Sequence, residues 1–173
     1  MFGALETNLY VYAFNNPLNA VDPTGLQVMC TWEQDTGHLL CDNWTTGEDG
    51  VVDANGWAGQ GVGLNNSSAQ GTRNTGPLPQ GYYDISAPNW GTAQKGAPAF
   101  PLDPWPLTRD EIAKLGRDSR PGGFWIHAWD RDRAKVLSSS KGCPIVAKEV
   151  RRDLANELKK AGGVGVLNVV PGP

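Results

Sequence analysis

The chain has few histidines and cysteines and no large excess of charge of either sign. Its 173 residues include 2 histidines, 3 cysteines, 15 basic and 18 acidic residues. Such a balance lacks the attraction that phosphate backbones and anionic lipids demand, so we expect neither nucleic acid nor a membrane as a partner. The histidines and cysteines show no metal-ligand spacing, and we expect no metal and no other cofactor.

Long apolar runs are also missing. No stretch approaches the ~18 uncharged apolar residues of a membrane span, and the N-terminus lacks the regions of a signal peptide. Any activity outside the cytoplasm would therefore need another carrier. Glycine (22) and proline (13) are plentiful instead, which favours a β-rich fold with many turns. The length predicts one main globular unit.

Two cysteines flank a predicted hairpin between residues 27 and 43. A four-residue loop at 34–37 would place Glu33 opposite His38, and hence Cys30 opposite Cys41. Directly opposed residues share a sheet face and lie within reach of a disulfide. Two buried free thiols in a reducing compartment are the alternative that the residues leave open.

Other elements follow from hydrophobic periodicity. We expect a short helix at 108–115, with Thr108 as N-cap and Glu111 completing a capping box. An amphipathic helix is expected at 146–161. Strands are expected at 82–85, in "GGFWIHAW" and at 164–170. The glycine-rich stretch near residues 56–74 has no Walker lysine and no GxGxxG before an apolar helix, which argues against nucleotide binding.

Cys143 and His127 form the candidate catalytic pair. A thiol attacks acyl carbons as the thiolate, so it needs a base or a cationic neighbour. With His38 in the predicted hairpin, the base is His127, and the polar run between the two residues predicts a loop that returns beside its strand. Lys141 adds positive charge, and the N–H groups of Gly142 and Cys143 are candidate oxyanion donors. A packing cysteine and a core histidine are the alternative.

The segment "NLYVYAFNNPLNAVDPTGL", residues 8–26, resembles the end of the Rhs-repeat core domain, the carrier shell of polymorphic toxins. The resemblance implies that residues 1–26 end that core domain and that residues 27–173 are the toxin. It also implies self-cleavage after Leu26, with Asp22 as the aspartate involved in the cut. Delivery by a carrier would fit the missing signal peptide.

The stretch "NGWAGQGVGLNNSSAQGTRNTGPLPQGYYDI", followed by "FWIHAW" and "SSSKGCPIVAKEVR", resembles the L,D-transpeptidase-like effector family. The resemblance implies a mainly β fold with one or two helices (α+β), an L,D-transpeptidase-like β-sandwich or barrel. It makes Cys143 the nucleophile and His127 the general base and acid, with Ser140 near the nucleophile. Arg117 or Arg120 would hold a substrate carboxylate. Lys141 departs from the family pattern, which has histidine there.

Together the two resemblances imply an antibacterial toxin secreted by a type VI apparatus into the periplasm of a competitor. Its substrate would be peptidoglycan stem peptides, cut as an L,D-carboxypeptidase or exchanged as an L,D-transpeptidase after meso-diaminopimelate. A cognate immunity protein would be a further partner. Two alternatives stay open: another cysteine peptidoglycan peptidase or amidase, and a non-catalytic cell-wall-binding module.

Overall fold

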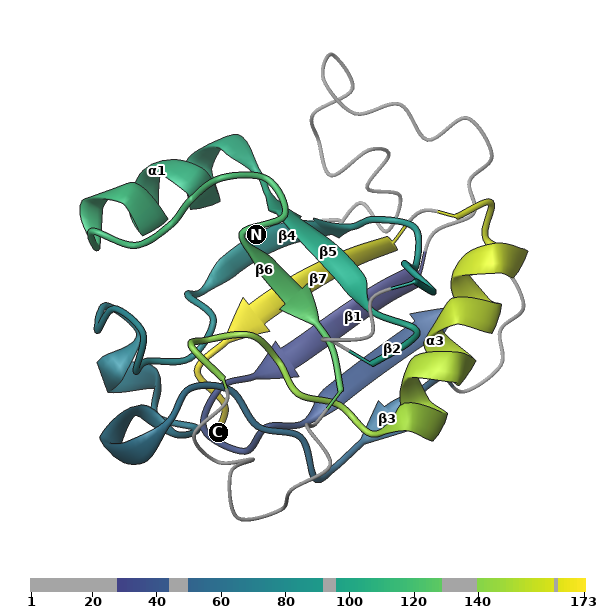
Figure 1. Cartoon of the computed structure of the whole chain (residues 1–173), viewed down its shortest axis with the longest axis horizontal. Helices are drawn as coiled ribbons and strands as arrows, with labels where there is room; N and C mark the ends of the chain where they lie inside the picture. The colour runs from purple at the N-terminus through teal and green to yellow at the C-terminus, as the bar shows by residue number, and fades with distance from the viewer. Residues whose placement is uncertain (1–27, 44–49, 92–95, 129–139, 164) are drawn as a thin grey trace, which may run out of the picture.

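A computed structural model of the chain describes residues 28–43, 50–91, 96–128, 140–163 and 165–173. Within these residues the strands form one seven-stranded sheet in the order β3-β2-β1-β7-β4-β5-β6 (Figure 1). Only β1 and β7 pair in parallel, and the other neighbours are antiparallel. The strands are β1 (Val28–Glu33), β2 (Leu39–Asn43), β3 (Val52–Asp53), β4 (Gly81–Ile85), β5 (Phe100–Pro104), β6 (Phe124–Ile126) and β7 (Gly165–Val170).

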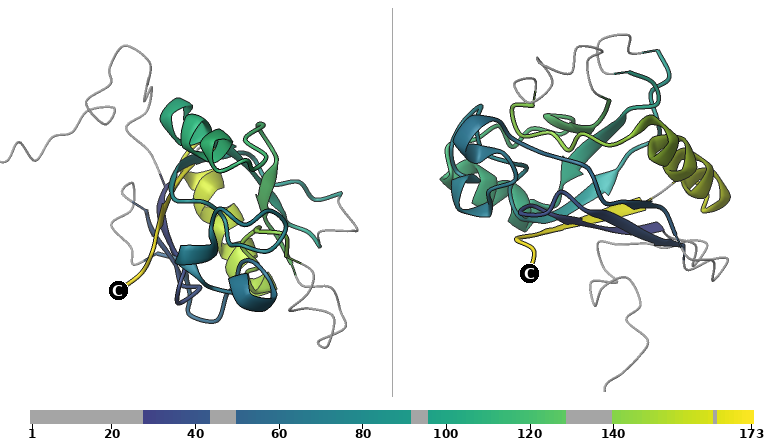
Figure 2. Two further views of the ribbon diagram at one scale, coloured as in Figure 1. Left: turned by 90° about the vertical axis from the view of Figure 1, so that its left-hand side faces the viewer. Right: turned by 90° about the horizontal axis from the view of Figure 1, so that it is seen from below.

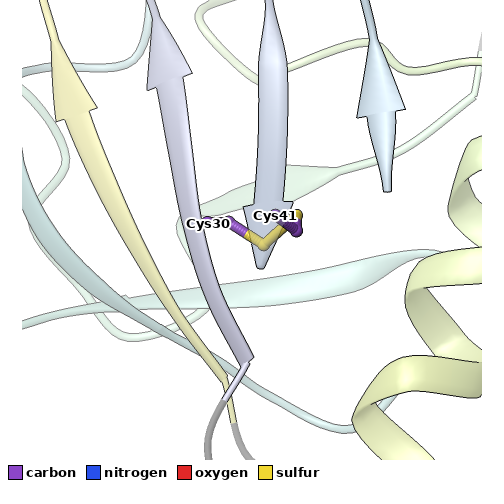
Figure 3. The surroundings of a disulfide bond; sticks show 2 residues. All are labelled: Cys30 and Cys41. Carbon is purple, nitrogen blue, oxygen red and sulfur yellow. A yellow bond between two sulfur atoms is a disulfide. The ribbon is translucent and has the colours of Figure 1, made fainter. Parts of the chain in front are cut away.

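The first hairpin has the predicted register. Cys30 lies opposite Cys41, and the Glu33 N–H donates to the His38 carbonyl at 3.0 Å, which closes the loop. Gly37 in this loop has a φ of 73°, the left-handed region that glycine adopts readily. The two cysteine side chains are buried and form a disulfide with an S–S distance of 2.12 Å (Figure 3).

One face of the sheet and helix α3 (Lys148–Lys160) enclose the main core (Figure 2). Strand β1 alternates buried and half-buried residues, as a strand with one covered face should. Leu154 and Leu158 of α3 are fully buried, and a Cβ on Gly165 of β7 would lie 2.6 Å from Leu158 Cδ2. The helix therefore packs directly on the central strand, which confirms the amphipathic helix with slightly shorter bounds.

The helix expected at 108–115 begins earlier than predicted. Helix α1 spans Pro106–Lys114, with Trp105 at the N-cap and proline in the first helical position. The prediction of Thr108 as N-cap was wrong: this residue lies inside the helix, where its hydroxyl accepts a hydrogen bond from the Tyr82 N–H at 2.9 Å. Thr108 thus fastens α1 to the start of β4.

The fold is mainly β with two α-helices among the described residues, as predicted. No helix in this part of the chain is both long and apolar enough to cross a membrane. The Rhs-like segment, including Asp22 and Leu26, lies outside the described residues.

Candidate active site

The end of β6 and the segment after Cys143 lie side by side. The His127 N–H donates to the Pro144 carbonyl at 3.1 Å, and the Val146 N–H donates to the His127 carbonyl at 3.0 Å. His127 and Ile145 thereby form a parallel bridge. Neighbouring strands lie about 5 Å apart, so Cys143, two residues before Ile145, has its backbone roughly 8 Å from that of His127. The structure therefore joins His127 through main-chain hydrogen bonds to the segment directly after Cys143.

The glycine-rich segment pairs with the other edge of residues 144–146. Trp57 and Ile145 exchange two main-chain hydrogen bonds of 3.1 Å and 2.7 Å as an antiparallel bridge. Ile145 is fully buried between the Trp57 and His127 segments. The chain just after Cys143 is thus held on both edges, which limits the positions open to this residue.

The ring of His127 is oriented by its own neighbour. Its Nδ1 lies 2.9 Å from the carbonyl oxygen of Ala128. A carbonyl only accepts, so this contact places the proton of the neutral imidazole on Nδ1 and the lone pair on Nε2. The arrangement selects the tautomer that a general base acting through Nε2 requires.

Ser140 ties the nucleophile segment together. Its side chain is fully buried, and its hydroxyl donates to the Cys143 carbonyl at 2.6 Å. The same oxygen accepts from the N–H groups of Gly142 and Gly59, each at 3.2 Å. Ser140 therefore closes a tight turn around Cys143 and connects it to the glycine-rich segment. Its role in the structure is to hold the main chain around Cys143.

One of the two predicted oxyanion donors is occupied. The Gly142 N–H points to Ser140 Oγ, so the prediction that it faces a substrate oxygen does not fit this geometry. Gly142 instead meets a steric need: its φ is 127°, and a Cβ there would lie 2.3 Å from Arg117 Nη2. Only glycine fits this conformation at this spacing. The Cys143 N–H remains the candidate oxyanion donor.

Arg117 is a buried residue of the site's framework. Its exposed fraction is 7%, and its Nη1 lies within hydrogen-bond distance of the carbonyl oxygens of Gln70, Gly76 and Pro77 at 2.6, 3.2 and 2.6 Å. Nη2 donates to the Lys141 carbonyl at 3.0 Å. Main-chain carbonyls thus accept hydrogen bonds from both terminal nitrogens of Arg117. Its contact with a substrate carboxylate stays a prediction.

Arg120, the other candidate for a carboxylate contact, is exposed and paired with Asp118. Its guanidinium makes hydrogen bonds of 2.9 Å and 2.6 Å to the two carboxylate oxygens. These bonds lower the pKa of Asp118 to about 2. Arg120 and Asp118 line a cavity of about 310 Å³ beside Arg117. Arg73, which the sequence analysis did not single out, lines it too. An anionic group entering this cavity would meet two exposed guanidinium groups and one carboxylate.

A larger cavity of about 750 Å³ lies between residues 50–52 and helix α3. It includes none of the candidate site residues, so the chemistry of the side chains, and not cavity size, identifies the site. Among the described residues there is no group of three or more His, Cys, Asp or Glu side chains that could hold a metal.

Sequence reasoning missed a second buried arginine. Arg151 of α3 is 1% exposed and donates from Nε to the Val146 carbonyl at 3.0 Å, and from Nη1 to the carbonyls of Gly96 and Pro98. It thereby joins the start of α3 to the segment leading into β5. The only signal in the sequence was a cationic residue on the apolar side of the helix, three residues before Leu154.

No protein-family model matches the chain, and no curated protein matches it either. Solved structures with the same fold are known. They include the helical cell shape determining protein Pgp2 from Campylobacter jejuni, 15% identical, with a TM-score of 0.61 over 87% of this chain and 49% of that one. The K307A mutant of that protein gives 14% identity and the same TM-score.

Bdellovibrio bacteriovorus Bd1075 is also similar, with 14% identity and a TM-score of 0.53 over 87% of this chain and 50% of that one. This chain thus spans about half the length of the proteins it resembles. At these identities the likeness shows the fold alone. The chain shares the fold of these proteins, and its described residues form a mainly β sheet with two helices, the fold class that was predicted.

Proposed function

We propose that the protein is a cysteine L,D-carboxypeptidase or L,D-transpeptidase acting on peptidoglycan stem peptides. The observation that supports this most is the main-chain pairing of His127 with the segment that follows Cys143. It supports a pairing between His127, whose tautomer leaves Nε2 as an acceptor, and Cys143, the one cysteine outside the disulfide. The likeness to cell shape determining proteins supports a cell-wall substrate, since peptidoglycan holds bacterial cell shape.

The proposed reaction uses the residues in fixed roles. Nε2 of His127 takes the proton of the Cys143 thiol, and the sulfur attacks the carbonyl carbon on the L-centre of meso-diaminopimelate. The Cys143 N–H stabilises the oxyanion that forms, an interaction worth about 3 kcal/mol in comparable sites. His127 then protonates the leaving amine of D-alanine as the C–N bond breaks. Water resolves the thioester in hydrolysis, and a D-amino acid resolves it in exchange.

The position of the substrate carboxylate is part of the proposal. The departing D-alanine carries a carboxylate, and two exposed arginines of the described residues, Arg73 and Arg120, line the cavity beside Arg117. Asp118 already neutralises Arg120, so Arg73 is the better candidate for a new contact. Loss of an arginine that binds this group would raise KM more than it lowers kcat.

The biological role proposed is that of a toxin. The Rhs-like motif at residues 8–26 supports release from a carrier shell, with Asp22 taking part in a cut after Leu26. Delivery by a type VI apparatus to the periplasm of a competitor, and a cognate immunity protein in the producing cell, complete the proposal. Toxicity should then appear when the protein is expressed with a signal peptide and be absent on cytoplasmic expression. Equal killing from both compartments would contradict a cell-wall target.

Mass spectrometry of muropeptides tests the activity. Purified protein is incubated with sacculi, which are then digested and separated. Wild-type protein should convert tetrapeptide stems to tripeptides, or exchange the terminal D-alanine for an added D-amino acid. Cys143→Ala and His127→Gln should leave the profile unchanged while keeping the circular dichroism of the wild type. Cleavage at another bond would indicate a different peptidase or amidase. If wild-type protein leaves the muropeptide profile unchanged, and both wild type and Cys143→Ala bind sacculi, the protein is a binding module.

A further inference from the structure

Arg117 lies beside the nucleophile segment without a carboxylate partner among the described residues. Its guanidinium is buried and donates to four main-chain carbonyls. None of the ion pairs between described residues includes it. The face of Phe124, 5.3 Å from the guanidinium carbon, covers it further. Carbonyl dipoles accept hydrogen bonds from Arg117 but do not cancel its charge, so its positive field extends to its neighbours.

The nearest part of the site is the peptide in front of Cys143. Nη2 donates to the Lys141 carbonyl, and it lies 2.3 Å from where a Gly142 Cβ would stand. Cys143 follows directly. An opposite charge within about 4–6 Å lowers the pKa of an acid by roughly 1–3 units, and more strongly where water is excluded.

We propose that Arg117 positions the Lys141–Gly142 peptide and stabilises the Cys143 thiolate through its buried charge. Burial lowers the pKa of the Arg117 guanidinium, while the electrostatic interactions that Tyr83 and Cys143 make with it when they ionise raise this pKa in part. A guanidinium remains protonated across the physiological range despite such burial. The catalytic meaning of this role rests on the proposed function, but the ionisation of Cys143 can be measured whatever the reaction.

Other charged or titratable groups near the sulfur have to be separated from Arg117. His127, directly after β6, pairs through its main chain with the segment that follows Cys143, and Lys141 is exposed two residues before Cys143. Tyr83 of β4 is fully buried, which raises the pKa of its hydroxyl and keeps it neutral at physiological pH. The design below therefore compares Arg117 with Lys141 directly, and also with an arginine in an exposed ion pair.

The test measures the pH dependence of alkylation by iodoacetamide. The chain has 3 cysteines, and Cys30 and Cys41 are joined, so Cys143 reports alone. Arg117→Met and Arg117→Lys both remove the guanidinium group and its branched set of hydrogen bonds, but only Arg117→Met removes the positive charge. The thiol pKa should be about 1–3 units higher in Arg117→Met than in Arg117→Lys. Arg120→Gln and Lys141→Gln are the controls, each expected within about 0.5 unit of the wild type because solvent screens exposed charges.

Equal thiol pKa values in the methionine and lysine variants would overturn the proposal, as would an effect of Lys141→Gln as large as that of Arg117→Met. Circular dichroism verifies that each variant is folded.

If Arg117→Met does not fold, Lys141→Gln carries a second test near pH 9, where an arginine keeps its charge and histidine side chains in general carry none. There the ratio of iodoacetate to iodoacetamide rates should exceed that of the urea-unfolded protein by about fivefold or more.

An equal ratio in folded and unfolded protein would contradict a cation at the sulfur. These results are independent of the muropeptide assay. If the proposed peptidase activity fails but the thiol pKa depends on Arg117, the electrostatic role stands. If stem peptides are cut and the thiol pKa does not depend on Arg117, only the role of this residue is lost.

Discussion

Replacing Ser140 with alanine should weaken the fold and the site together. The hydroxyl makes three hydrogen bonds to main-chain groups of Gly59, Gly142 and Cys143, and its residue is 0% exposed. A net hydrogen bond contributes about 1 kcal/mol, and a buried group left without a partner costs about 1–3 kcal/mol. Ser140→Ala should therefore lower the free energy of unfolding by about 3 kcal/mol.

In a domain of this size such a loss corresponds to a decrease in Tm of roughly 6–12 °C. Urea unfolding and calorimetry measure it, and Ser68→Ala is the matched control. Ser68 is exposed, and its hydroxyl bonds only to the Asn66 side chain within the described residues, so its loss should cost less than about 0.5 kcal/mol. A loss below about 1 kcal/mol for Ser140→Ala would refute the reasoning. Alkylation of Cys143 should also change in Ser140→Ala and not in Ser68→Ala.

Three further predictions concern stability. The Cys30–Cys41 disulfide joins residues 11 apart, so Cys30→Ser/Cys41→Ser should lower the free energy of unfolding by about 3 kcal/mol, and both thiols should resist alkylation until reductant is added. Burial and the opposed Asp103 carboxylate raise the pKa of Asp84, so the charged form destabilises the fold above that pKa. Asp84→Asn should be more stable than the wild type at pH 7 by a few tenths of a kcal/mol in urea unfolding, with the difference vanishing below about pH 4. Arg151→Ala should lower the free energy of unfolding by at least about 3 kcal/mol in the same assay, because it leaves buried carbonyls without hydrogen-bond donors. A loss under about 1 kcal/mol would show that other groups or water donate to these carbonyls.

The features that sequence predicted well depend on local pattern. The register of the first hairpin follows from counting residues across one turn, because side chains alternate with a period of 2 along a strand. Helix α3 follows from its amphipathic spacing. His38 was likewise assigned to the hairpin, and the structure places it directly before β2.

The features that sequence could not predict depend on contacts between distant segments. Arg117 and Arg120 stand three residues apart in a polar run, yet one is buried and the other exposed. The difference arises because carbonyls from residues 70–77 converge on Arg117, and no local pattern records that convergence. The direction of the Gly142 N–H likewise depends on where the Ser140 hydroxyl lies.

The start of α1 shows a related limit. A threonine followed three residues later by a glutamate fits a capping box, but Pro106 begins the helix two residues before Thr108. The threonine hydroxyl then serves β4 instead of a helix N-terminus. Tertiary contact decided between two local patterns that the sequence allowed equally.

Trapping the acyl-enzyme tests the central claim most directly. The protein is mixed with a stem tetrapeptide ending in meso-diaminopimelate and D-alanine, quenched in acid and digested, and the peptide that contains residue 143 is weighed. The account predicts a thioester on Cys143 carrying the tripeptide, with D-alanine released in equal amount, and no adduct in His127→Gln. Release of D-alanine by Cys143→Ala, or an adduct on any other side chain, would contradict it.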